Sequence, residues 1–189
     1  PVEDATPIID DAASLYRRMK RVEYVFDDRL YTPEELWQTH GAEQVLLVCN
    51  TVEDARRLAD TCPFPCLHLS TAMTPSHRRR VLQLARDRID RGEPVRLVST
   101  QLIEAGVDIS FPKVIRIEGP LDGIIQAAGR GNRNGEVDGR GTVGVARLRD
   151  GKLPPAPYRT GAQIVRRWIN EGRDLDPSDP DWIARFYKW

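Results

Sequence analysis

Two arginines three residues apart stand in a segment whose residue types suit phosphate. Residues 126–133 read Gln-Ala-Ala-Gly-Arg-Gly-Asn-Arg, and the spacing lets Arg130 and Arg133 point the same way from a helix end. A guanidinium stays charged at any working pH, and its planar fork binds oxygen anions. Gly129 and Gly131 permit close approach and unusual backbone angles. Alone, the pattern fits a basic surface helix end equally well, with glycine ending the helix.

An upstream segment favours the phosphate interpretation. An apolar run at 95–99 leads into Thr-Gln-Leu-Ile-Glu-Ala-Gly-Val-Asp at 100–108. This order predicts hydroxyls, a glycine and a carboxylate beyond the carboxyl end of a strand, where open α/β sheets bind ligands. We expect Asp108 to accept hydrogen bonds from ribose hydroxyls and Ser99 or Thr100 to meet a phosphate. In the alternative, Asp108 caps a turn and Thr100 is an ordinary strand residue.

The elements that must position these residues are indicated by hydrophobic patterning. Short runs rich in Val, Ile and Leu alternate with longer amphipathic ones, as in α/β folds with strands buried on both faces. Helices are expected to begin at Thr51 and at Thr74-Pro75, and a third to span 121–130. We expect strands at 22–26, 45–49, 66–69, 95–99, 114–118 and 142–148. The prediction is a three-layer α/β domain with a mostly parallel sheet and helices on both faces.

The chain changes character after Leu148. Three prolines between 154 and 157 indicate a linker, and an apolar stripe from Ile164 to Ile169 predicts an amphipathic helix. A last helix is expected near Asp179-Pro180, with aromatic side chains that either stack on bases or, more simply, pack on the domain. We therefore expect a lead-in or interdomain linker at 1–21, the main domain at 22–150, and a linker with a truncated C-terminal helical extension at 151–189.

Bulk composition narrows the class of protein. The 28 basic and 28 acidic residues cancel, so contact with nucleic acid must come from local clusters. No run of 18 apolar residues exists, so no transmembrane helix is expected, and the acidic N-terminus does not resemble a signal peptide. Three cysteines, an odd number, favour a reducing cytoplasm over a disulfide framework. Cys62 and Cys66 do not have a standard metal-ligand spacing, so no metal site is expected.

The segments named above resemble the signature motifs of superfamily 2 helicases. Residues 99–108 resemble motif V, residues 126–133 resemble motif VI, which supplies arginine fingers, and residues 45–51 resemble the looser motif IV. Residues 68–71 and 74–79 resemble the segment between motifs IV and V. Two stretches of sequence are similar to motifs V and VI of the CRISPR-associated helicase-nuclease of type I systems: STQLIEAGVDISF and LDGIIQAAGRGNRNGE. The resemblance covers about residues 22–148.

This resemblance implies a role for each motif. ATP and Mg²⁺ would lie between two RecA-like domains of the same protein, of which this chain is the second, C-terminal one. Arg130 and Arg133 would contact the γ-phosphate as the catalytic arginine fingers. The nucleotide would also be met by Gln126, Gly106, Asp108 and Gly129. Single-stranded nucleic acid would be met by Thr100, Ser70, Thr71, Asn50 and Thr51.

What the sequence lacks bears on activity. Motif VI usually has arginine directly after its first residue, whereas this chain has Ala127. The sequence contains no G-x-x-x-x-G-K-[ST] phosphate loop, no acidic box and no His-Asp pair of a nuclease site. We therefore expect the isolated chain to bind no ATP usefully and to have no ATPase, helicase or nuclease activity.

The resemblance leads to one main functional hypothesis and two alternatives. The main one is the second motor domain of an ATP-dependent translocase on single-stranded DNA, in a type I CRISPR effector that works with an RNA-guided surveillance complex in the cytoplasm. The first alternative is an RNA helicase domain of the same superfamily. The second is a non-catalytic RecA-like interaction module, against which the intact Arg130, Arg133 and Asp108 argue.

Overall fold

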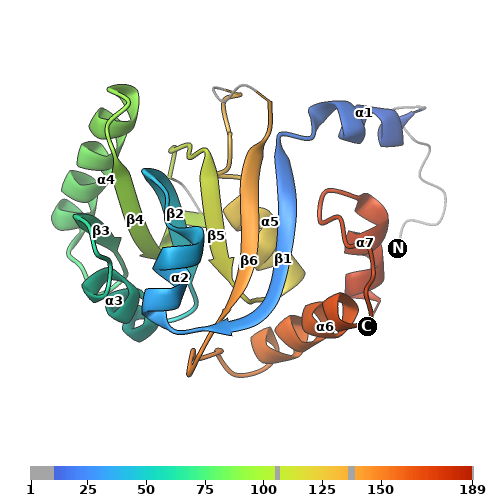
Figure 1. Cartoon of the computed structure of the whole chain (residues 1–189). Helices are drawn as coiled ribbons and strands as arrows, with labels where there is room; N and C mark the ends of the chain where they lie inside the picture. Colours follow the sequence, from blue (N-terminus) through green and yellow to red (C-terminus); the bar gives the residue numbers. More distant parts are fainter. Residues whose placement is uncertain (1–10, 105–106, 136–138, 189) are drawn as a thin grey trace.

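A single parallel β-sheet forms the centre of the molecule (Figure 1). The computed structural model describes residues 11–104, 107–135 and 139–188. The sheet has six strands in the order β1-β6-β5-β2-β4-β3, and every neighbouring pair is parallel. The strands are β1 (Val22–Tyr31), β2 (Gln44–Cys49), β3 (Cys66–Leu69), β4 (Val95–Thr100), β5 (Lys113–Ile117) and β6 (Gly141–Leu148). The α/β prediction is confirmed, and the sheet is parallel throughout rather than mostly.

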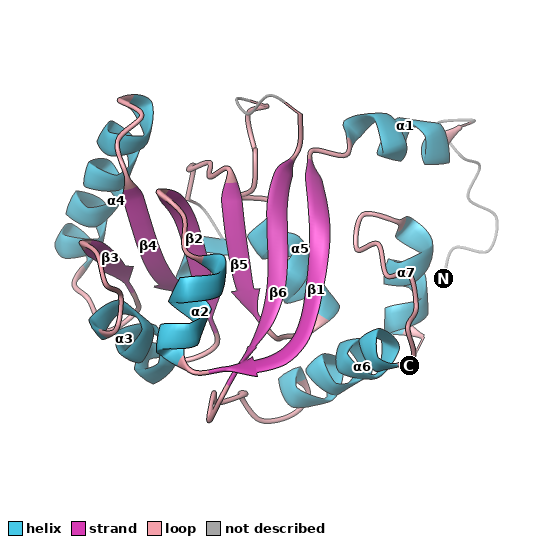
Figure 2. Cartoon of the chain, in the orientation of Figure 1, coloured by secondary structure: helices cyan, strands magenta, loops and turns pink. Residues whose placement is uncertain are grey.

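Helices cover both faces of this sheet, and alternating strand residues explain the three layers. Leu46 and Val48 of β2 point to one apolar cluster, and Leu47 and Cys49 point to another on the opposite face. The first cluster includes α4 (Pro75–Asp90) and α5 (Leu121–Ala128), and the second includes α2 (Pro33–His40) and α3 (Val52–Asp60). In Figure 2, α2 lies in front of the sheet and α5 behind it.

Local sequence signals set most helix starts. The hydroxyl of Thr51 accepts from the backbone of Asp54 at 3.1 Å, and Thr74 caps α4 in the same way. α2 was not anticipated, although Thr32 and Glu35 form a capping box at its start. α1 (Ala12–Met19) was also not anticipated. α5 ends at Ala128, two residues earlier than expected, so both arginines of motif VI lie beyond the helix.

The last two helices pack on the domain. α6 (Tyr158–Asn170) and α7 (Pro180–Tyr187) share a third apolar cluster with α5 and β6. Trp168 is buried there, with its ring centroid 5.1 Å from that of Trp182 and 6.2 Å from that of Phe186. The packing interpretation of these aromatics is confirmed. No described helix is long and apolar enough to cross a membrane.

Candidate functional site

One edge of the sheet collects the residues expected to meet nucleic acid. Carboxyl ends of parallel strands lie at the same edge, and β2, β4 and β3 are neighbours. Asn50 and Thr51 follow β2, Ser70 and Thr71 follow β3, and Thr100 ends β4. The structure therefore brings all five together at adjoining strand ends.

Two of these five have hydroxyls without a protein partner. Ser70 is fully buried and Thr100 is 7% exposed, and among the described residues neither hydroxyl has a hydrogen-bond partner. A buried polar group left unpaired costs about 1–3 kcal/mol, so these hydroxyls favour an additional partner. Thr71 is exposed.

The other two side chains have protein partners. The Asn50 amide nitrogen donates to the carbonyl of Glu118 at 2.8 Å, while its oxygen accepts from Arg116 and Tyr158. The Thr51 hydroxyl donates to Asp54 at 2.8 Å. Their side chains hold this edge of the sheet in place.

Motif VI lies at the opposite end of the sheet. α5 follows β5 and leads the chain back, so that Gly131 forms a bridge with Phe111, just before β5 begins. Phe111 donates to the carbonyl of Arg130 at 2.8 Å and accepts from Asn132 at 2.9 Å. The backbone that follows α5 thus lies near the amino end of β5, whereas the Arg130 side chain reaches η1, which follows β4.

Arg130 is anchored on motif V. Arg130 is only 7% exposed. Its guanidinium donates from Nε to the carbonyl of Ile103 and from Nη2 to the carbonyl of Glu104, both at 2.9 Å. A third contact, from Nη1 to Gly129, is longer at 3.5 Å. The two carbonyls belong to the 3₁₀ helix η1 (Gln101–Glu104) that follows β4. A guanidinium has five N–H donors, so donors remain for a phosphate beside this anchor.

Arg133 is more accessible and faces Asp108. Its Nε lies 3.1 Å from Asp108 Oδ1, and the side chains are 41% and 77% exposed. The Arg133 backbone donates to Ser110 Oγ at 3.0 Å, and Arg86 of α4 donates to the Asp108 carbonyl at 2.8 Å. Asp108 therefore lies beside the start of β5 and not beyond the carboxyl end of β4, where its position in the sequence had placed it. It is within reach of the same ligand as Arg133.

The glycines of motif VI serve packing more than backbone freedom. Gly129 has an ordinary helical φ of −61°, and the positive φ of this segment lies at Asn132, at 43°. A Cβ on Gly131 would lie 2.9 Å from Val22 Cγ1, so glycine is needed for contact with β1. Of the two properties expected of these glycines, close approach is used at Gly131, and Gly129 does not use an unusual backbone angle.

The remaining motif residues are placed simply. Gln126 and Gly129 are exposed on and after α5. Ala127 is fully buried in an apolar cluster, so arginine at this position would have to leave the core. Gly106 lies outside the described residues.

A buried polar cluster joins motifs IV and V and was not anticipated. Arg116 of β5 is fully buried, and its Nε lies 3.1 Å from Glu104 Oε1. It donates to Asn50 Oδ1 at 2.9 Å and to the Tyr158 hydroxyl at 2.6 Å. Burial raises the pKa of Glu104 to about 7, and the charge of Arg116 opposes this rise. The available sequence signal was an arginine inside the apolar strand 113–117.

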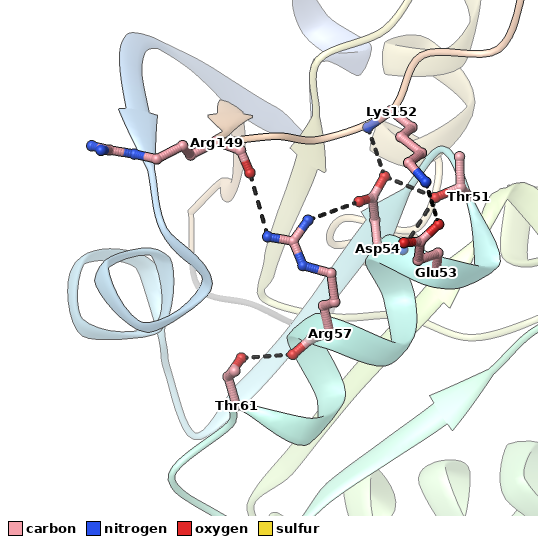
Figure 3. A network of polar contacts seen from close by, with 7 residues as sticks. All are labelled: Thr51, Glu53, Asp54, Arg57, Thr61, Arg149 and Lys152. Carbon is pink, nitrogen blue, oxygen red and sulfur yellow. Dashed lines mark hydrogen bonds and ion pairs between the residues drawn. The ribbon is translucent and has the colours of Figure 1, made fainter.

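A second polar network ties the chain after β6 to α3 (Figure 3). Buried Asp54 accepts from the Thr51 hydroxyl at 2.8 Å and from the Lys152 backbone at 3.0 Å. Arg57 lies 3.5 Å from Asp54 and donates to the Arg149 carbonyl. This network fixes the linker that leads to α6.

The described residues contain no cluster suited to a metal ion. No group of three or more His, Cys, Asp or Glu side chains could hold one in the described part of the chain. The three cysteines are free thiols, and burial raises the pKa of Cys66 to about 12. A catalytic Mg²⁺ would need ligands beyond those described.

Comparison with known proteins identifies the family. A family model of the C-terminal part of the CRISPR-associated nuclease/helicase Cas3 matches residues 41–136. Cas3 of Haloferax volcanii is 48% identical over 113 residues, which are 59% of this chain and 10% of that protein. The chain therefore spans about a tenth of the length of this curated relative.

Two solved structures show the same fold at lower identity. The ATP complex of Cas3 from T. fusca has a TM-score of 0.66 at 16% identity, over 89% of this chain and 23% of the other. A chain of a CRISPR RNA-guided surveillance complex before nicking has a TM-score of 0.55 at 16% identity, over 89% and 27%. These neighbours confirm the RecA-like fold, and the match to the family model shows that the chain belongs to the family of Cas3 helicase C-terminal domains.

Proposed function

We propose that this chain is the second motor domain of an ATP-dependent helicase that moves on single-stranded DNA in a CRISPR effector. Residues 22–150 form its RecA-like unit, and residues 151–189 form a helical extension. A first RecA-like domain supplies the phosphate loop and the ligands of Mg²⁺, and ATP binds between the two domains. This division of labour follows from the absence of a phosphate loop and an acidic box in the sequence.

The contact between motifs V and VI carries this proposal. Arg130 is held by two carbonyls of η1, and Arg133 stands exposed beside Asp108. Such an arrangement presents guanidinium donors and a ribose acceptor on one surface. On ATP binding, Arg133 exchanges the Asp108 carboxylate for the γ-phosphate, and Asp108 turns to the ribose hydroxyls. Gln126, Gly106 and Gly129 complete the nucleotide-facing surface.

The nucleic-acid path crosses the other end of the sheet. The buried hydroxyls of Ser70 and Thr100 lack protein partners and point to a hydrogen-bonding ligand at the strand ends. Thr71, Asn50 and Thr51 extend this row along adjoining strands. Backbone phosphates of a single strand suit hydroxyl and amide donors of this kind. In this proposal an RNA-guided surveillance complex delivers the DNA, and the likeness to a chain of such a complex supports this part.

Reconstitution tests the proposal. The chain is mixed with a first RecA-like domain that carries the phosphate loop, and ATP hydrolysis is measured with and without a single-stranded DNA oligonucleotide. We expect DNA-stimulated turnover, and we expect Arg130→Ala and Arg133→Ala each to lower kcat by about 10³–10⁵. Arg140→Ala is the matched control, since Arg140 is a partly exposed arginine near the same end of the sheet that pairs with Glu23.

Three outcomes would overturn parts of this proposal. Measurable ATP turnover by the isolated chain that depends on Arg130 would contradict its inactivity alone. Equal loss in all three arginine variants would show a general charge effect and not fingers. Stimulation by an RNA oligonucleotide and none by DNA would assign the chain to an RNA helicase instead.

A further inference from the structure

The buried cluster around Arg116 connects the two ends of the sheet. Asn50, at the nucleic-acid end, accepts from Arg116 Nη1 at 2.9 Å, and Arg116 Nε lies 3.1 Å from Glu104 Oε1. The main-chain carbonyl of Glu104 accepts from Arg130 Nη2 at 2.9 Å. One unbroken series of polar contacts therefore runs from motif IV through motif V to the candidate arginine finger.

Tyr158 of α6 completes this cluster from outside the matched family segment. Its hydroxyl accepts from Arg116 at 2.6 Å and donates to Asn50 Oδ1 at 2.7 Å. A Cβ on Gly119 would lie 2.8 Å from this hydroxyl, and a Cβ on Gly123 would lie 3.2 Å from Arg116 Nη2. Two glycines thus leave the space that the tyrosine and the guanidinium occupy.

Arg116 has little freedom to move within its site. Its side chain is fully buried, and both Nη1 and Nη2 donate hydrogen bonds. Nη1 also donates to the carbonyls of Val48 at 3.3 Å and Ile117 at 2.7 Å, whereas Nε makes an ion-pair contact with Glu104 but no hydrogen bond. A buried group held by several partners passes a displacement of one partner to the others, because leaving any partner unpaired is costly.

We propose that Arg116, Glu104 and Tyr158 are positioning residues that couple the nucleic-acid end of this domain to Arg130. A strand that binds beside Asn50 displaces its amide, Arg116 follows, and the Glu104 segment shifts the carbonyls that hold Arg130. The inference rests on the proposed function and adds to it the route by which DNA stimulates ATP hydrolysis. None of the three residues touches the reacting atoms.

The test measures the stimulation ratio in the reconstituted pair of domains. Turnover at saturating ATP is compared with and without a saturating oligothymidylate strand for the parent, Tyr158→Phe, Glu104→Gln and Arg116→Lys. We expect the ratio to fall about fivefold or more in each variant, since allosteric couplings commonly amount to 5–150-fold. Lysine keeps the charge of Arg116 but cannot reach all of its partners. Saturating DNA removes any contribution from weaker binding.

Glu118→Gln is the matched control. The Glu118 carboxylate pairs with Arg166 of α6 and Arg147 of β6, so the control removes other arginine–glutamate pairs near the same helix. Only the main-chain carbonyl of Glu118 contacts the series, at Asn50, and the substitution keeps this carbonyl. We expect its stimulation ratio to stay within twofold of the parent. If the three residues had a purely structural role, their substitution would lower stability and turnover without changing the stimulation ratio. Tyr158→Phe removes only a hydroxyl, so it distinguishes coupling from a structural role even if another variant does not fold.

A second readout uses the isolated chain and needs no turnover. The Nε–H resonance of Arg130 is followed by NMR as the oligothymidylate strand is added. We expect a shift in the parent and in Glu118→Gln, and a smaller one in Glu104→Gln. An equal shift in Glu104→Gln, or an unchanged stimulation ratio in Tyr158→Phe, overturns the coupling. Absence of any DNA-stimulated turnover in the parent overturns the proposed function instead.

Discussion

At the scale of single residues, Glu104 makes the stability of the domain depend on pH. Burial raises its pKa from 4.5 to about 7, with Arg116 opposing and Asp122 adding to the rise. Between pH 4.5 and about 7, Glu104 therefore stays protonated in the folded chain and is ionised in the unfolded chain. The stabilising contribution is complete below about pH 4.5 and is lost as the pH rises through about 7.

Glu104→Gln removes this titration. Between pH 4.5 and 7.5, we expect the free energy of unfolding of the parent to fall relative to the variant by on the order of 3 kcal/mol. Denaturant titrations of both proteins at several pH values measure the difference. Parallel pH profiles for parent and variant would show that Glu104 stays ionised beside Arg116.

Residue types identified the candidate site, but its contacts came from the fold. The arginines of motif VI were evident from their spacing, whereas the partners of Arg130 lie 26 and 27 positions earlier in the chain. Asp108 was assigned to the wrong end of the sheet because the path from β4 to β5 returns along the domain. No local pattern encodes such a return. Arg116 was missed for the same reason, since its partners come from four separate segments.

At the scale of elements, Asp54 joins α3 to the linker after β6. It is 1% exposed and accepts from the Lys152 backbone at 3.0 Å, in addition to its bonds within α3. Asp54→Ala leaves the amide of Lys152 and the Thr51 hydroxyl without this acceptor. We expect a loss of about 2–3 kcal/mol in the free energy of unfolding, together with faster hydrogen exchange at Lys152.

The adjacent carboxylate provides the control. Glu53 pairs with the Lys152 side chain at 2.5 Å, but both side chains are about 60% exposed. Because solvent screens an exposed ion pair, this pair contributes little to stability. The Glu53→Gln variant should therefore have the melting temperature of the parent and unchanged hydrogen exchange at Lys152. Equal destabilisation by both substitutions would assign the effect to surface charge and not to the buried acceptor.

The strands could be predicted from the sequence. All six strands follow from apolar runs, because parallel strands covered on both faces must be apolar. β1 extends beyond its apolar part through Asp27 and Asp28, because an edge strand tolerates polar residues. α5 ends at Ala128 with Gly129 as its C-cap, which the glycine signalled, although the arginines continued the apparent pattern.

At the scale of the whole molecule, we expect α6 and α7 to unfold together with the sheet on which they pack. Trp168 is 1% exposed among side chains from α5, β6 and α7. Because its ring is packed among these side chains, Trp168→Ala opens a large cavity. We expect a loss of about 3–5 kcal/mol and a single, earlier thermal transition.

Tyr187 of α7 gives the comparison for this last prediction. It is 70% exposed, so Tyr187→Ala should change the free energy of unfolding by no more than about 0.5 kcal/mol. Because Tyr158 stands at the start of α6, loosening this helix also removes a contact to Arg116 and Asn50. Trp168→Ala should therefore speed hydrogen exchange in residues 101–104, well away from the substitution. A separate transition for α6 and α7, with unchanged exchange at 101–104, would show that the extension folds independently and does not support the motor motifs.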